Sequence, residues 1–526
     1  MNHLHFIDLT IIGLYMLGVF LLGSFFGKYV KGAGDYFVAG RALPFWAIGM
    51  SIVVSDIGAT DFIATAGAGY TYGVAAANFD WIGSMPAMVL AAFIFVPYDW
   101  RSGVYTIPDF LGRRYNVVVQ GVHGTIWGVF LIVMLAVMLW LTADTLATVL
   151  GIDPTLTLGP LKLRMWVWLV VLITGIYTFS GGLTAVVMTD VVQMIVMFVG
   201  GGALVSLTLW QVGGWGSLQE QVLAMGPEYE NHFTLLLPHD SATPYPWTGI
   251  VFGLGLVMAT GYMCGNQAVV QRTLGARSEW DAKGGMLFAG FLKSFIPLLI
   301  ILPGLTAVVL APGLENGDQA VPTMIRDYLP PGLRGLMFAA LFAALMSSVD
   351  SYLNSASTIW TTDIYGRLVH LTTGKELTSA QALRIGRVLT ITFILLGGLF
   401  APMLAGQKTM YNFIQTALSM FQGPVFAILL LGIMWRRTNQ WGGMAGLLLG
   451  VTFTTILHLT EGLFKSEDPF LFVAWWSFVF SFVVTVIVSL LTPKDPDEKV
   501  RGLIFGQVMD DGEVQRVLGE RITEEG

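Results

Sequence analysis

Charged residues are scarce in this 526-residue chain, since Asp, Glu, Lys and Arg make up only 12% of it against 55% hydrophobic residues. A soluble protein of this length needs a far more charged surface, whereas a surface that faces lipid needs none. The single cysteine, Cys264, excludes a disulfide framework and a multi-cysteine metal site. The modest net charge of −7 indicates no nucleic-acid partner. The composition therefore predicts an all-α membrane protein that crosses the bilayer many times.

Catalytic motifs are missing as well. The sequence contains no HExxH, GxSxG or Walker A motif, and its seven histidines form no metal-binding pattern. These absences leave no basis for an intramembrane protease or an ATP-driven pump, so we do not expect an enzyme. What the chain has instead is 62 glycines and long apolar segments.

Apolar segments of the length needed to cross the hydrocarbon layer recur along the whole chain. About thirteen qualify at roughly 20 residues each. They are 6–26, 43–70, 75–97, 118–150, 161–179, 183–211, 247–266, 281–311, 333–366, 384–406, 408–436, 440–461 and 468–493. The first segment is too long for the apolar part of a signal peptide and is predicted to be a membrane span. We therefore expect a transmembrane domain over 1–493 and a charged tail over 494–526.

The distribution of basic residues orients these spans. With the N-terminus outside, most of the 27 Lys and Arg residues fall on the cytoplasmic side, as the positive-inside rule requires. The long segment 212–246, which this orientation places outside, contains acids but no Lys or Arg. We therefore predict a multi-pass protein of the plasma or inner membrane, surrounded by lipid, with a cytoplasmic C-terminal tail.

Two acids interrupt the second predicted span. In an unbroken helix, Asp56 and Asp61 would point about 140° apart. A local break at Ile57–Gly58 would aim both at one cavity and free backbone carbonyls for a cation, as in the discontinuous helices of secondary transporters. The alternative is that the glycines of this span only allow close helix packing. That alternative does not account for the two acids.

Two further ionisable residues lie within predicted spans, where charge is expensive. Asp80 belongs either to a binding site or, beside Trp81, to the interfacial belt. Lys293 lies deep in an apolar segment, too far from either end to reach water easily. A buried lysine needs an anionic partner, and Asp56, Asp61 and Asp80 are the candidates.

The ninth span carries hydroxyl and amide side chains at helical spacing: Ser347, Ser351, Asn354 and Thr358, with Ser348 and Asp350 beside them. Oxygen ligands in this arrangement suit a hard cation. The alternative is a packing face of small residues whose hydroxyls bond their own helix.

Asp190, in the sixth span, either caps its helix or contributes to a cation site. With Asp350 and Ser351 it could form a second such site near the cytoplasmic exit, because two carboxylates and a hydroxyl offer enough hard oxygen for sodium or a shared proton.

Five ordered motifs suggest a family. They are DYFVAGRALPFWAIGMSIVVSDIG (35–58), YTIPDFLGRRYN (105–116), YTFSGGLTAVVMTDVVQ (177–193), NQAVVQRTLGARS (266–278) and MSSVDSYLNSASTIWTTDIYG (346–366). Together they resemble the sodium/solute symporter family, in the branch of the sodium/glucose cotransporters. The resemblance runs from about residue 6 to 493. It implies a LeuT-type fold of five plus five helices, with inverted repeats at about 43–211 and 247–436.

The resemblance also implies site residues. The sodium site of the family corresponds to the carbonyls of Val54, Ile57 and Ala344 and the hydroxyls of Ser347 and Ser348. Its inner-gate tyrosine corresponds to Tyr262, and two substrate-contacting residues correspond to Lys293 and Gln415. An acid linked in some members to a second cation corresponds to Asp190.

Other positions depart from the sugar-transporting members. Where those members carry Asn, Gln and Glu, this chain carries Asp56, Asp61 and Asp80, and sugar-contacting asparagines correspond to Met134 and Ala259. We therefore predict a sodium-coupled symporter that imports a small polar solute by alternating access. A sugar or polyol is the leading substrate class and an amino acid or other zwitterion the next. A non-transporting membrane sensor on the same fold is the rival from another class.

Overall fold

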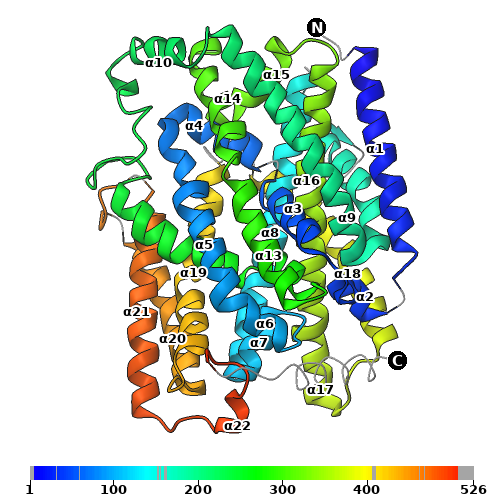
Figure 1. Ribbon diagram of the computed structural model, residues 1–526, viewed down its shortest axis with the longest axis vertical. Helices are drawn as coiled ribbons and strands as arrows, with labels where there is room; N and C mark the ends of the chain where they lie inside the picture. The colour runs from blue at the N-terminus through cyan, green and yellow to red at the C-terminus, as the bar shows by residue number, and fades with distance from the viewer. Residues whose placement is uncertain are drawn as a thin grey trace.

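A computed structural model describes residues 5–506, except 31, 59, 151–152, 154–155, 159–162, 405–409, 461 and 467. The chain forms an upright bundle of long helices, with α1 at one edge and α20 and α21 at the opposite edge (Figure 1). Among the described residues, 10 helices are long and apolar enough to cross a membrane, or up to 12 if each of two bent pairs counts as one span. The chain is thus a multi-pass membrane protein, as its composition predicts.

The first half of the chain contains α1 to α9. Its helices are α1 (Phe6–Gly27), α2 (Ala33–Val38), η1 (Ala39–Arg41), α3 (Phe45–Asp56), η2 (Asp61–Thr65), α4 (Ala66–Tyr72), η3 (Gly73–Ala77), η4 (Phe79–Ser84), α5 (Met85–Leu90), η5 (Ala91–Phe95), α6 (Val96–Arg101), α7 (Ile107–Arg114), α8 (Val117–Leu150) and α9 (Met165–Gln211). Two short antiparallel strands, β1 (Thr157–Leu158) and β2 (Leu163–Arg164), precede α9.

The second half contains the remaining elements. They are α10 (Trp215–Leu223), η6 (Pro227–Tyr229), η7 (Gly249–Ala259), α11 (Thr260–Gly265), α12 (Gln267–Leu274), α13 (Glu279–Lys293), α14 (Ile296–Leu310), η8 (Gly317–Gln319), α15 (Ala320–Tyr328), α16 (Leu333–Ile359), η9 (Trp360–Gly366), α17 (Arg367–Thr373), α18 (Ser379–Phe400), η10 (Ala401–Leu404), α19 (Met410–Met434), α20 (Gln440–Leu459), α21 (Phe470–Leu491) and α22 (Asp497–Val500).

Two bent helix pairs define the centre of the bundle. The segment that begins with α3 bends by 60° between Asp56 and Asp61, and the segment η7–α11 bends by 51° into α12 at Asn266. At the first bend Ile57 leaves helical geometry, with ψ at 81°. Asn266 is extended, and its side chain caps the helix that follows. The break predicted at Ile57–Gly58 is therefore present.

The predicted division between the spans 161–179 and 183–211 falls at a kink within α9. Gly182 leaves helical geometry there with a positive φ of 55°, which only glycine tolerates, and Gly182–Gln211 is by itself long and apolar enough to cross a membrane. The segments 212–246 and 312–332, which lie between predicted spans, contain the helices α10 and α15. Hydropathy misses such short helices because they are too polar or too brief to resemble a span. The predicted charged tail, 494–526, lies within the described residues only as far as residue 506.

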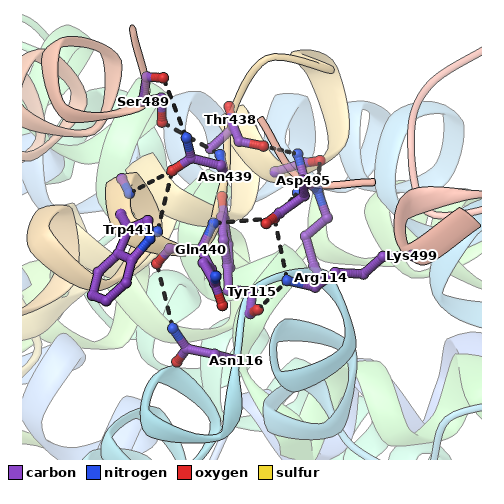
Figure 2. Close-up of polar contacts among 12 residues, drawn as sticks. Arg114, Tyr115, Asn116, Thr438, Asn439, Gln440, Trp441, Ser489, Asp495 and Lys499 are labelled. Atoms are coloured by element: carbon purple, nitrogen blue, oxygen red, sulfur yellow. Dashed lines mark hydrogen bonds and ion pairs between the residues drawn. The ribbon is translucent and has the colours of Figure 1, made fainter. Parts of the chain in front are cut away.

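The described part of the C-terminal tail is docked onto the base of the bundle. Arg114, which is fully buried, donates to the carbonyls of Gly432 at 2.7 Å and Thr438 at 2.8 Å, and lies 3.9 Å from Asp495 (Figure 2). Lys499 donates to the Tyr115 carbonyl at 2.5 Å. The tail therefore links α7 to the connection between α19 and α20.

A buried acid near the opposite end of the bundle makes stability depend on pH. Burial raises the pKa of Asp318, in η8, to about 6, and its nearest donor is the Met410 amide at 3.5 Å. Between its ordinary pKa and about 6, the folded chain holds a proton that the unfolded chain has released. The contribution of Asp318 to the free energy of unfolding is therefore fully present at low pH and is lost as the pH rises through about 6.

We therefore expect Asp318→Asn to be more stable than the wild type at pH 7 by roughly 2–3 kcal/mol, and the difference to vanish toward pH 4. Melting temperatures of the purified protein from pH 4 to 7 measure this. Asp240→Asn, at a side chain that is 59% exposed, is the matched control. An Asp318→Asn protein whose melting temperature follows that of the wild type at every pH would contradict the expectation.

Candidate functional site

A central cavity of about 110 Å³ lies beside the break after α3. All six predicted substrate residues line it: Asp56, Asp61, Asp80, Tyr262, Lys293 and Gln415. Phe79, Phe130 and Tyr352 add aromatic surface, and Met134 and Ala259 also contribute to the wall. The cavity thus combines a few ionisable groups with a mostly apolar and aromatic lining, which is typical of small-molecule sites.

Lys293 joins two of the three cavity acids. Its ammonium group contacts the Asp56 carboxylate directly and lies 2.9 Å from Asp80. It also donates to the Ser84 hydroxyl at 3.0 Å, and the residue is only 4% exposed. An extension of Lys293 toward water at the end of its span does not account for these contacts. A position of Asp80 in the interfacial belt beside Trp81 does not account for them either. Three elements, α3, η4 and α13, are thereby tied together by charge.

Asp61 stands apart from this triad. Its carboxylate accepts hydrogen bonds from the Gly58 amide at 3.1 Å and from the Thr65 hydroxyl at 3.1 Å. These bonds stabilise the start of the helical segment after the break, because they satisfy a backbone donor that the break leaves free. Of the three acids that could pair with Lys293, the structure thus selects Asp56 and Asp80.

The residues predicted to bind sodium lie on two neighbouring segments, with Val54 and Ile57 at the end of α3 and Ala344, Ser347 and Ser348 on α16. The Ser348 hydroxyl donates to the Ser55 carbonyl at 3.0 Å. A side chain on Gly58 would come 2.7 Å from that same hydroxyl, so only glycine allows this approach. Val54, Ile57 and Ala344 are fully buried in the same region. Backbone carbonyls at the break and the two hydroxyls of α16 are hard oxygen atoms of the kind that sodium prefers, and the sodium site itself stays a prediction.

Asp190 lies in a buried charge network. Its carboxylate is 3.1 Å from the Arg272 guanidinium and accepts a hydrogen bond from Ser347 at 2.6 Å. Arg272 also donates to the hydroxyls of Ser55 and Ser351, each at 2.5 Å. Asp190 and Arg272 are both fully buried. Because Asp190 bonds side chains of other helices well inside α9, it is not a helix cap.

The predicted second cation group includes members of this network. Asp190 and Ser351 share it, and the positive charge between them belongs to Arg272. Asp350 is buried on α16 beside Ser351, and the second cation site itself stays a prediction. A sodium ion or proton at Asp190 would therefore compete with the guanidinium group.

Arg272 is the functional residue that the sequence reasoning missed. Its place after the span 247–266 assigned it to a cytoplasmic segment, whereas the structure buries it in α12. One available signal was its position inside the motif NQAVVQRTLGARS, where Val269, Val270 and Leu274 lie within three residues of it. The hydroxyl side chains of α16 make both kinds of contact that the sequence suggested. Ser347 and Ser351 bond to the buried network of Asp190 and Arg272. Ser351 and Thr358 also donate to carbonyls of their own helix.

Comparison with known proteins identifies the family. The family model of the sodium:solute symporter family matches residues 36–450. The chain belongs to that family. A sodium/glucose cotransporter of Vibrio parahaemolyticus is 31% identical to this symporter, with 94% of the symporter and 92% of the relative covered. A sodium/myo-inositol cotransporter of Homo sapiens is 30% identical, with 95% and 75% covered.

Solved structures share the fold of the symporter. A substrate-bound outward-open Na⁺-coupled sialic acid symporter matches 93% of the symporter and 99% of its own length, with a TM-score of 0.79 at 22% identity. Mhp1, a nucleobase-cation-symport-1 family transporter, matches with a TM-score of 0.56 at 13% identity. The symporter therefore has the predicted LeuT-type fold. It is a sodium-coupled solute transporter and not an enzyme.

Proposed function

We propose that this symporter imports a neutral polyhydroxylated solute, a sugar or polyol, together with sodium. The observation that supports the proposal is that the Lys293 ammonium group already forms ion pairs with Asp56 and Asp80. A solute carboxylate would have to displace one of these acids, whereas solute hydroxyl groups can donate to the remaining carboxylate lone pairs. The names of the glucose and myo-inositol cotransporters among its relatives support the same substrate class.

A second candidate is an amino acid or other zwitterion. Three acids face one lysine in the cavity, so the wall carries more negative than positive groups. Asp61, which contacts no cation in the described ion pairs, would then receive the ammonium group of the solute. The residues proposed to touch the solute are the same in both cases: Asp56, Asp61, Asp80, Tyr262, Lys293 and Gln415.

Sodium is proposed to bind between the break after α3 and α16. The ligands would be the carbonyls of Val54, Ile57 and Ala344 and the hydroxyls of Ser347 and Ser348. Bound sodium would stabilise the outward-open arrangement, and solute binding would then allow closure. The membrane potential adds about 2.3 kcal/mol per charge per 100 mV to the driving force.

The proposed repeats run from about 43 to 211 and from 247 to 436, so that each begins near one of the two bent helix pairs. The proposed topology places the N-terminus outside and the tail 494–526 in the cytoplasm, because most of the 27 Lys and Arg residues then fall in segments on the cytoplasmic side. A second cation at Asp190, Asp350 and Ser351 remains a prediction, and charge-to-solute flux ratios above one would support it.

Sodium-dependent uptake in proteoliposomes tests the proposal. We expect uptake of labelled sugars or polyols to exceed that of amino acids, and Ser347→Ala with Ser348→Ala to abolish its sodium dependence, since two of roughly five oxygen ligands are lost. Ser357→Ala is the matched control, because Ser357 is a buried serine of the same helix that bonds only the Asn354 carbonyl of that helix. Sodium-stimulated uptake that persists in the double variant would refute the sodium site. Faster uptake of amino acids than of sugars or polyols would refute the proposed substrate class and favour the second candidate.

A further inference from the structure

A second, larger cavity of about 1350 Å³ opens at the base of the bundle, where α17 and α18 meet α2 and α7. Four basic residues line it: Arg367, His370, Arg384 and Arg387. We name these four residues and the cavity between them the basic pocket. The Nε atom of Arg367 and the Nδ1 atom of His370 are buried without a hydrogen-bond partner in the described chain. Polar atoms in this situation require a ligand or water to satisfy them.

The acids of this cavity do not neutralise the pocket. Asp109 is paired with Arg113 at 2.9 Å. Asp363 accepts hydrogen bonds from the neutral donors Thr106 and Gln120, each at 2.8 Å. Glu376 lies exposed in the loop between α17 and α18. Among the described residues, no ion pair joins these acids to Arg367 or Arg384, so both guanidinium groups are available to an anionic ligand.

The pocket is continuous with the lipid-facing surface. Val388 and Ile391 of α18 line it and are 57% and 45% exposed. Arg384 and Arg387 follow the first residue of α18 by five and eight positions, which is about 8 to 12 Å along the helix axis. The arginines thus lie near the end of a predicted membrane span and the apolar wall lies deeper. A phospholipid has the same arrangement, with its phosphate group at the membrane surface and its acyl chains deeper in the bilayer.

The positive-inside rule alone does not explain this arrangement. It accounts for basic residues at the cytoplasmic end of a span, but such residues ordinarily extend into water. Here several of them line one cavity, with buried nitrogen atoms and an apolar wall on the bilayer side. We propose that the basic pocket binds the phosphate-bearing headgroup of an anionic phospholipid. Arginine side chains suit this group because their planar donors match phosphate oxygens.

The test uses the full-length protein in nanodiscs of phosphatidylcholine, with and without phosphatidylglycerol. We expect phosphatidylglycerol to raise the melting temperature of the wild type, and native mass spectrometry to detect the bound lipid. Arg367→Gln with Arg384→Gln should abolish both effects, because each arginine removed weakens binding roughly tenfold or more. Lys375→Gln, an exposed residue of the same loop that does not line the pocket, should behave as the wild type.

Two results would overturn the proposal. One is an equal rise in melting temperature in the double variant, which would place the lipid elsewhere. The other is a rise produced in phosphatidylcholine nanodiscs by inorganic phosphate or glycerol phosphate alone, which would identify a soluble anion as the ligand. If the double variant is unstable in phosphatidylcholine, the single variant Arg384→Gln, at an exposed side chain, provides the same comparison.

Discussion

Lys293→Met is expected to abolish solute uptake and to lower the free energy of unfolding by about 3–5 kcal/mol. The substitution keeps the length of the side chain but leaves Asp56 and Asp80 without the cation that both contact. Two uncompensated carboxylates in a buried cavity repel each other and reorganise the surface that the solute must fit. Uptake in proteoliposomes and the melting temperature of the purified protein measure the two effects separately.

Lys283→Met is the matched control, because Lys283 lies on the same helix and pairs with Glu279 at a more exposed position. Exposed pairs contribute about 0–1 kcal/mol, so both uptake and stability should remain close to wild type. A triple variant with Asp56→Asn, Asp80→Asn and Lys293→Met should regain stability but not uptake. If Lys293→Met alone transported solute normally, Lys293 would have only a structural role.

Arg272→Gln is expected to destabilise the protein by a similar amount, about 3–5 kcal/mol, since it leaves Asp190 as a buried, unpaired charge. It also removes the donors to the hydroxyls of Ser55 and Ser351, which connect α3 to α16 beside the proposed sodium ligands. Sodium affinity should therefore change along with the melting temperature. Asp190→Asn with Arg272→Gln should recover much of the lost stability, because neither charge then lacks its partner.

Arg277→Gln separates this effect from the general loss of an arginine. Arg277 lies five residues further along and pairs with Asp281 at 2.9 Å, but its side chain is 60% exposed. We expect its replacement to change stability by no more than about 1 kcal/mol. Equal melting temperatures for Arg272→Gln and Arg277→Gln would mean that the buried pair contributes nothing particular to the fold.

Several features of this symporter follow from its sequence alone. The apolar segments, the scarcity of charge and the bias of Lys and Arg determine a multi-pass helical membrane protein, because hydropathy and helix length are local properties. The acids on either side of Gly58 predict the break after α3, and Lys293 within an apolar segment predicts a charged partner. The ordered motifs identify the family. The six cavity residues were likewise named from sequence, by burial of charge and by resemblance.

Which charges meet, in contrast, was decided by the tertiary structure. Lys293 had three candidate acids, and the choice of Asp56 and Asp80 depends on how α13 packs against α3 and η4. Arg272 was assigned to a cytoplasmic segment, yet the bend at Asn266 turns α12 inward and buries it against Asp190. The docked tail and the basic pocket likewise join residues that are far apart in the chain. Local sequence determines how costly a buried charge is, but only the packing of distant helices determines which group neutralises it.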